Sequence, residues 1–182
     1  MAKRAPAAAP VTLADGVLAA WQTNARCSAF LVEHLPARLW SASVPQARRT
    51  IGSIAVHLHN SRSRWVRTLG REHGIRVPPL LGRSAGRAEV LKALPRSAQG
   101  IADILSLGLD HGGVVPPSAG YVWRNLPLDV AHVLTYFSAH EAHHRGQIIA
   151  LARILGQRLP AEAVNGVWLW HLRRREPATP VR

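Results

Sequence analysis

Residues 127–155 carry the longest helical pattern in the chain and limit the possible folds most strongly. Apolar side chains recur there every three to four residues, Pro127 suits the first turn of a helix, and Gly156 is a typical stop. A helix of this length needs other elements to cover its apolar side. The pattern therefore predicts a protein built from packed helices.

Three further stretches show the same periodicity, and segments rich in Pro and Gly separate them. They cover approximately residues 12–36, 46–70 and 87–109. Pro95, inside the third stretch, predicts a kink or a break. We expect an all-α fold, a four-helix bundle with long connections and a short helical piece within residues 164–172.

The length of 182 residues suits a single domain. We expect a flexible tail at 1–10, one helical-bundle domain over 11–175 and a C-terminal tail at 176–182. The first residues lack the hydrophobic region of a signal peptide, no apolar run is long enough to cross a membrane, and the single Cys27 excludes an internal disulfide. These features predict a cytoplasmic protein.

The formal net charge is +13, from 23 Lys and Arg against 10 Asp and Glu. An excess of this size can attract nucleic acid. The arginines are scattered, however, and no recognition motif interleaves them with aromatic residues. We therefore favour a compositional bias toward Arg over specific nucleic-acid binding, and keep a basic nucleic-acid-associated protein as the weaker alternative.

A pair of histidines, His140 and His144, lies within the longest predicted helix. Residues four apart on a helix are separated by about 40° around its axis, so the two rings project side by side. Val133 and Phe137 fall in the same direction, which aims the pair at the bundle interior. Buried imidazoles need partners, and a zinc, nickel or iron ion or other core side chains could supply them.

A third ligand would have to come from another helix. The stretch at 46–70 contains His57 and His59, and each lies about 100° from the centre of its apolar stripe, on opposite sides. Helix phase does not choose between them, so both remain candidates.

The segment from His140 to His144 also matches H-E-x-x-H, the zincin metalloprotease motif, in which Glu141 would act as general base. The metzincin extension requires Gly and His where this chain has Gln147 and Ala150. No strand that could align a peptide is visible either. A zinc protease is therefore a minor alternative.

The same helix resembles the DinB/YfiT-like metal-binding four-helix-bundle family, the DinB superfamily, through HEAHHRGQI at 140–148 and LARILG at 151–156. His57-Leu58 followed by Trp65 is similar to the family pattern in an earlier helix. The resemblance implies a bundle of the up-down-down-up type, often a dimer, with one divalent metal ion bound by three histidines. Carried over by position, these ligands are His57, His140 and His144.

Family members include thiol-dependent S-transferases and maleylpyruvate isomerases. The resemblance thus implies a metal-dependent transferase or hydrolase with a low-molecular-weight thiol or other small substrate, although no catalytic residue is assigned. A non-catalytic metal-binding stress protein is the alternative. Gln147, Glu141 and Tyr136 are candidates for contacts behind the ligands, where they could orient an imidazole or a bound water.

Overall fold

The computed structural model describes residues 11–44 and 49–176. The tail predicted at 1–10 lies outside these ranges, as does all but Glu176 of the tail predicted at 176–182. Within the described ranges, the only β-type pairing is the isolated bridge between Val114 and Asp129. The helices are α1 (Leu13–Glu33), α2 (Ile51–Trp65), α3 (Arg87–Asp110), α4 (Val130–Ile154), α5 (Ala161–Gly166) and α6 (Trp170–Arg173), with short helical turns at Ala37–Leu39, Val66–Gly70 and Arg71–His73.

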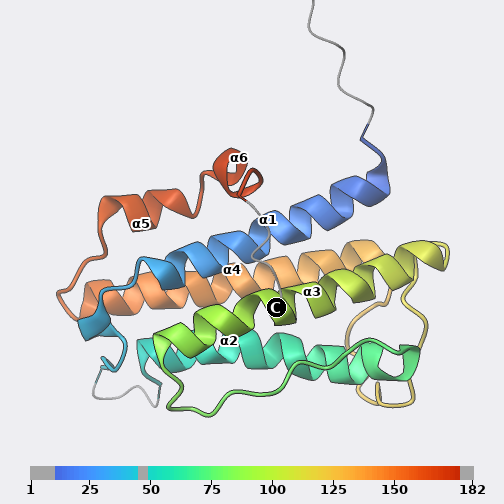
Figure 1. Ribbon diagram of the computed structural model, residues 1–182, viewed down its shortest axis with the longest axis horizontal. Helices are drawn as coiled ribbons and strands as arrows, with labels where there is room; N and C mark the ends of the chain where they lie inside the picture. The colour runs from blue at the N-terminus through green and yellow to red at the C-terminus, as the bar shows by residue number, and fades with distance from the viewer. Residues whose placement is uncertain (1–10, 45–48, 177–182) are drawn as a thin grey trace, which may run out of the picture.

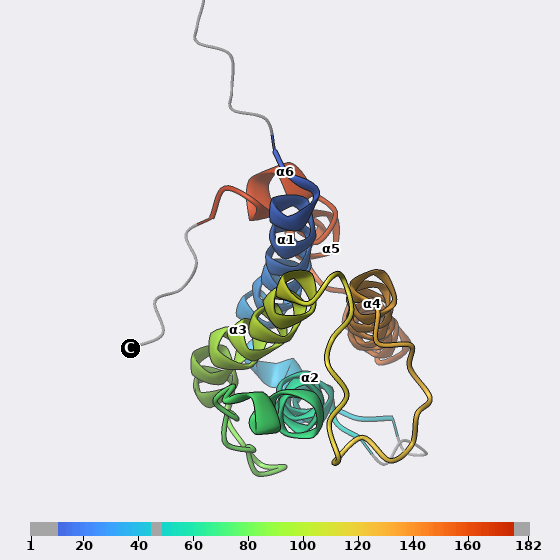
Figure 2. The ribbon, with the colours of Figure 1, turned by 90° about the vertical axis from the view of Figure 1, so that its right-hand side faces the viewer.

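The four long helices form a bundle (Figures 1 and 2). In Figure 1, α1 and α4 run in one direction along the bundle and α2 and α3 run in the other. The up-down-down-up order expected from the resemblance is thus confirmed. Two long loops make these connections. The one between the turn at Arg71–His73 and α3 returns along the bundle, so that α3 runs parallel to α2, and the one between α3 and α4 reverses the direction of the chain (Figure 1).

Side-chain caps fix where three of these helices begin. Thr12 caps α1 by accepting a hydrogen bond from the Asp15 amide, and Thr50 caps α2 in the same way. The longest helix begins at Val130 rather than at the predicted Pro127, because Asp129 is its cap and accepts from the His132 amide. The prediction of its start was therefore early by one turn.

Pro95 does not split α3, which continues as one helix from Arg87 to Asp110. A proline removes one backbone hydrogen bond and crowds the preceding turn, which usually bends or ends an isolated helix. Here α3 packs along both α1 and α2, and this packing keeps the helix continuous.

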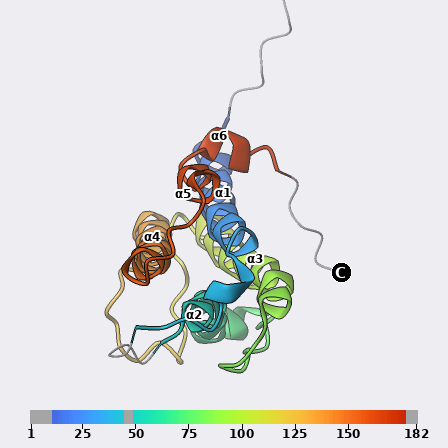
Figure 3. The same cartoon turned by 90° about the vertical axis from the view of Figure 1, so that its left-hand side faces the viewer.

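The short C-terminal helices α5 and α6 lie beside α1 (Figure 3). They replace the single short piece predicted within residues 164–172. Gly166 at the end of α5 packs directly against the ring of Phe30 in α1, where any side chain would collide. No helix among the described residues has the length and apolar character needed to cross a membrane.

Two mid-helix glycines differ in what surrounds them, which allows a matched test of the packing. A Cβ at Gly100 in α3 would lie 2.7 Å from Cγ2 of the buried Val66, whereas nothing lies within 4 Å of a Cβ at Gly146 in α4. Alanine gains about 1 kcal/mol of helix propensity at either place. Overpacking costs about 1–3 kcal/mol at Gly100 only.

We therefore expect Gly100→Ala to lower the free energy of unfolding by about 1 kcal/mol and Gly146→Ala to raise it by a similar amount. Urea denaturation followed by circular dichroism measures both. A Gly100→Ala protein more stable than the wild type would contradict the close contact between α3 and Val66.

Candidate metal centre

Three histidines from two helices form a cluster at the side of the bundle. His57 comes from α2, and His140 and His144 come from α4. One ring nitrogen of each lies within 4.8 Å of those of the other two, and Nε2 of His140 is 3.1 Å from Nε2 of His144. The structure therefore brings together the three residues that the family resemblance selected.

The spacing of these nitrogens suits a transition metal. Zinc binds imidazole nitrogens at about 2.0–2.1 Å, so two ligands at angles between about 90° and 109° are about 2.8–3.4 Å apart. The separation of 3.1 Å between His140 and His144 falls in this range. The ring centroid of His57 lies 4.6 Å from that of His144 and 5.5 Å from that of His140, and its ligand nitrogen lies within 4.8 Å of theirs.

Gln147 determines which nitrogen of His144 faces the cluster. Its carbonyl oxygen Oε1 lies 2.7 Å from Nδ1 of His144 and can only accept, so Nδ1 carries the hydrogen. The neutral ring then presents the lone pair of Nε2 to the cluster. The amide group of Gln147 donates in turn to Nε2 of His143 at 2.9 Å. Gln147 is thus placed to orient the ring of His144 as a metal ligand.

Tyr136 lies one helical turn before His140, and its ring stacks on the His140 ring at an interplanar angle of 17°. It also meets Trp65 of α2 edge to face. Tyr136 therefore packs against the cluster through its ring and forms part of the wall beside it.

His59, the other candidate third ligand, faces a different part of the molecule. It is buried, and its Nε2 lies 2.9 Å from the carbonyl oxygen of Pro79 in the loop before α3. Of the two candidates that helix phase left open, His57 lies next to the pair on α4 and His59 does not.

The cluster lies at the edge of the buried face of α4. His144 is buried, but His57 and His140 are only partly covered. The buried positions of α4 include Glu141, Arg145, Ile148 and Ala152, so the helix is rotated relative to the stripe predicted from its apolar residues. As a result, the histidine pair borders the interior and remains reachable from solvent.

The environment of the cluster keeps the imidazoles neutral. Burial, the nearby His144 and the cation Arg49 lower the pKa of His57 to about 4. Burial and His144 likewise lower the pKa of His140 to about 4. Burial also lowers the pKa of His144, although its hydrogen bond to Gln147 opposes this. A metal ion competes with protons for ring nitrogens, so at neutral pH the cluster is in its ligand form.

A buried ion pair lies behind the cluster and joins its two helices. Arg62 of α2 donates to both carboxylate oxygens of Glu141 in α4, through Nε at 2.7 Å and Nη2 at 2.6 Å. Ser28 of α1 donates a short hydrogen bond to the same carboxylate. Arg145 donates to Ser28 at 2.8 Å and to Oδ1 of Asn24 at 3.0 Å.

Sequence reasoning missed this network, because charged residues on a helix normally face solvent. Glu141 contacts Arg62 and Ser28, and among the described residues it makes no hydrogen bond to a histidine, so its proposed role of orienting a ligand directly is not supported. Both of its oxygens are held, which also leaves it unavailable as the general base of a zinc protease. The zinc-protease alternative is therefore left without Glu141 as its general base.

Removal of the buried carboxylate should be far more damaging than removal of an exposed one. Glu141→Ala leaves Arg62 charged and unpaired inside the protein, so we expect a loss of about 3–5 kcal/mol in the free energy of unfolding. Glu33→Ala, which removes a partly exposed partner of Arg26, should cost no more than about 1 kcal/mol. Equal losses in urea denaturation would contradict this account.

Because of this ion pair, we predict that the protein loses stability as the pH falls into the acid range. Burial works against ionisation of Glu141, but the charge and hydrogen bonds of Arg62 and the hydrogen bond of Ser28 outweigh it, and its pKa is lowered. The contribution of a carboxyl group with a lowered pKa is complete above its unfolded value, about 4.3, and disappears as pH falls through the folded value. The melting temperature of the wild type should therefore fall more steeply below pH 4.3 than that of Glu141→Gln.

Comparison with known protein families supports the resemblance noted in the sequence. Residues 122–174 match the sequence model of the DinB family. The matched segment contains His140, His144 and Gln147 together with α4, α5 and α6, but not His57. No curated protein matches the chain. Residues 122–174 are thus similar to the DinB family.

Proposed function

We propose that this protein binds one divalent transition-metal ion through His57, His140 and His144. The observation that carries the proposal is the cluster of three neutral imidazoles from two helices, whose ligand nitrogens lie within 4.8 Å of one another, with those of His140 and His144 at 3.1 Å. Zinc, nickel and iron all accept imidazole, and geometry alone does not distinguish them.

We further propose that the site is catalytic, of the thiol S-transferase or hydrolase type. Three protein ligands leave at least one coordination position open, and a metal ion there lowers the pKa of a bound water or thiol. The partial exposure of His57 and His140 supports this reading over a structural metal, because structural sites are usually closed by four protein ligands. The family resemblance also implies a homodimer, which sedimentation of the purified protein would test.

Each residue around the cluster has a role in this proposal. Gln147 holds the His144 ring with its Nε2 lone pair available. Tyr136 and Trp65 form an aromatic wall, which excludes water on that side. Arg49 and Arg64 contribute positive charge near His57, so a substrate or cosubstrate bearing a negative charge would be favoured.

Metal content tests the proposal directly. The wild type, reconstituted with zinc, nickel or iron and then dialysed, should retain about one equivalent by elemental analysis. His57→Ala, His140→Ala and His144→Ala should each lose most of it, since two imidazoles seldom hold a transition metal stably.

His143→Ala is the matched control, because His143 is exposed, lies on α4 beside the site and falls outside the cluster. It should retain the metal, with at most a modest drop in affinity through Gln147. A wild type that holds none of the three metals after reconstitution would contradict the proposal. So would equal loss of metal in the His143→Ala variant.

The open coordination position can be observed by spectroscopy. The cobalt-substituted protein should develop a sulfur-to-cobalt charge-transfer absorption when a small thiol is added, because the thiolate would bind the metal. The S-methylated analogue should have no such effect. If the spectrum does not respond to any thiol or to added anions, the metal is structural and the non-catalytic alternative is correct.

A further inference from the structure

Four large apolar side chains are exposed within one short stretch that leads from α5 into α6. The stretch is Trp168–Leu172, called the apolar tip below, and only His171 within it is not apolar. Trp168 is 76% exposed, and Leu169, Trp170 and Leu172 are 39%, 40% and 39% exposed. Apolar side chains exposed together mark a surface that meets a partner or a membrane, whereas isolated ones are ordinary.

Backbone hydrogen bonds fold the apolar tip into a compact turn. The amide of Trp170 donates to the carbonyl oxygen of Trp168 at 2.9 Å, which closes a three-residue turn around Leu169. The amides of Leu172 and Arg173 donate to the carbonyl oxygen of Leu169 at 2.9 and 3.1 Å. The two tryptophans therefore leave the chain close to each other.

Contacts on both sides of the apolar tip hold it against α1. Before it, Gly166 packs directly against the ring of Phe30, and Val167 is buried. After it, the guanidinium of Arg173 lies 3.9 Å from the centre of the Phe30 ring, and Arg173 pairs with Glu176 at 3.0 Å. The tip is thus fixed at both ends, and its tryptophans are exposed although their neighbours are buried.

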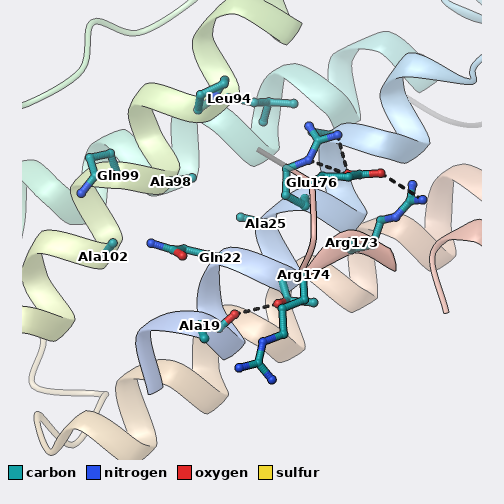
Figure 4. A pocket seen from close by; sticks show the side chains of 14 residues that line it. Ala19, Gln22, Ala25, Leu94, Ala98, Gln99, Ala102, Arg173, Arg174 and Glu176 are labelled. Carbon is teal, nitrogen blue, oxygen red and sulfur yellow. Dashed lines mark hydrogen bonds and ion pairs between the residues drawn. The ribbon is translucent and has the colours of Figure 1, made fainter. Parts of the chain in front are cut away.

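Two exposed arginines without an acidic partner follow the apolar tip. Arg174 and Arg175 are exposed, and neither forms an ion pair within the described part of the chain. The nearby carboxylate of Glu176 is shared by Arg26 and Arg173. In Figure 4 it is joined to Arg173, whereas the side chain of Arg174 points away from it. Two positive charges next to the tip are therefore left without compensation.

The apolar tip lies on the side of the bundle away from the histidine cluster. In Figures 2 and 3, α6 lies outside α1 at the top of the molecule, whereas α2, which carries His57, lies at the bottom. A surface in contact with the tip would therefore leave the histidine cluster uncovered.

We propose that the apolar tip docks this protein on a membrane surface that contains anionic lipids. Trp168 and Trp170 enter the headgroup region, where a tryptophan ring contacts acyl chains while its N–H stays hydrated. Arg174 and Arg175 lie against the anionic headgroups. An apolar group and a basic patch together are the two signals that a stable peripheral attachment needs. This inference does not depend on the proposed function of the metal centre.

Size and charge favour a lipid surface over a second protein chain. A stable protein interface takes about 20–30 residues from each partner, whereas this surface consists of Trp168–Leu172 and two arginines. The net charge of +13 also makes two copies of the chain repel each other. A bilayer accepts a few inserted side chains, and its anionic lipids attract the arginines.

Co-sedimentation of the full-length protein with lipid vesicles tests the proposal. We expect at least about tenfold tighter binding to phosphatidylcholine vesicles with about one third phosphatidylglycerol than to pure phosphatidylcholine. Added salt should weaken the binding without abolishing it, because salt screens the charges but not the apolar contact. His140→Ala should bind the vesicles as the wild type does, since the histidine cluster takes no part.

The apolar part of the surface is tested by removal of its tryptophans. Trp168→Ser/Trp170→Ser should weaken binding to the anionic vesicles at least about tenfold. Trp123→Ser is the matched control, because Trp123 is 68% exposed in the loop before α4, and it should change binding less than about twofold. Melting curves confirm that the variants fold. If the double variant does not fold, the arginine variants decide.

The charged part is tested by two double variants that remove the same net charge. Arg174→Gln/Arg175→Gln should weaken binding to the anionic vesicles at least about tenfold. Arg67→Gln/Arg71→Gln, at exposed positions after α2, should weaken it less than about threefold. The difference separates docking through the tip from a general attraction by net charge.

Fluorescence quenching shows which tryptophans enter the membrane. Bromine on the acyl chains quenches only those indole rings that reach them. Anionic vesicles with brominated chains should quench the wild type and Trp123→Phe to the same degree, and Trp168→Phe/Trp170→Phe much less. Phenylalanine keeps the apolar contact, so the double variant remains bound to the vesicles.

Four results would each overturn the proposal. They are the absence of binding to anionic vesicles, undiminished binding by a folded Trp168→Ser/Trp170→Ser protein, equal weakening by the two arginine double variants, and equal quenching in Trp168→Phe/Trp170→Phe. A dimer that the serine double variant dissociates, with no binding to vesicles, would assign the tip to an interface between copies. None of these results bears on metal content, so the two proposals fail or succeed separately.

Discussion

The ion pair between Arg62 and Glu141 holds α2 and α4 together, and the histidine cluster depends on how those helices are placed. Two opposite charges deep in a protein are tolerated only when their geometry is close and their remaining hydrogen bonds are made. A shift of either helix would separate the pair and leave both charges buried without compensation. The same shift would separate His57 from His140 and His144. Because the ion pair fixes how α2 and α4 are placed, it also fixes the three neutral imidazoles of the cluster close to one another.

The network also connects the cluster to the rest of the bundle. Ser28 of α1 accepts from Arg145 and donates to Glu141, so α1 is joined to α4 directly and to α2 through the ion pair of Glu141 with Arg62. Arg62 further donates to the carbonyl oxygen of Leu94 in α3. All four long helices thus meet in one set of hydrogen bonds. This set of hydrogen bonds therefore determines the positions of the histidines as much as the apolar core does.

The general fold could be predicted because it depends on local signals. Apolar periodicity located the four long helices, and Thr12 marked the start of the first. The charged interior could not be predicted, since a Glu or Arg on a helix is interpreted as solvent-facing unless its partner on another helix is known. Glu141 and Arg145 are such cases. His57 and His59 could not be separated by phase because they lie at about equal angles on opposite sides of the apolar stripe, and the sequence does not tell which side faces α4.

The rotation of α4 follows from these same buried charges and has a consequence for chemistry. A stripe defined by apolar residues alone passes through Val133 and Phe137 and points His140 inward. Burial of Glu141 and Arg145 turns the helix, so that His140 lies at the border of the core. A fully enclosed cluster would suit a structural metal, whereas one at the border leaves room for a further ligand from solvent. The buried charges of Glu141 and Arg145 are thus the reason why the candidate metal centre lies at the border of the core.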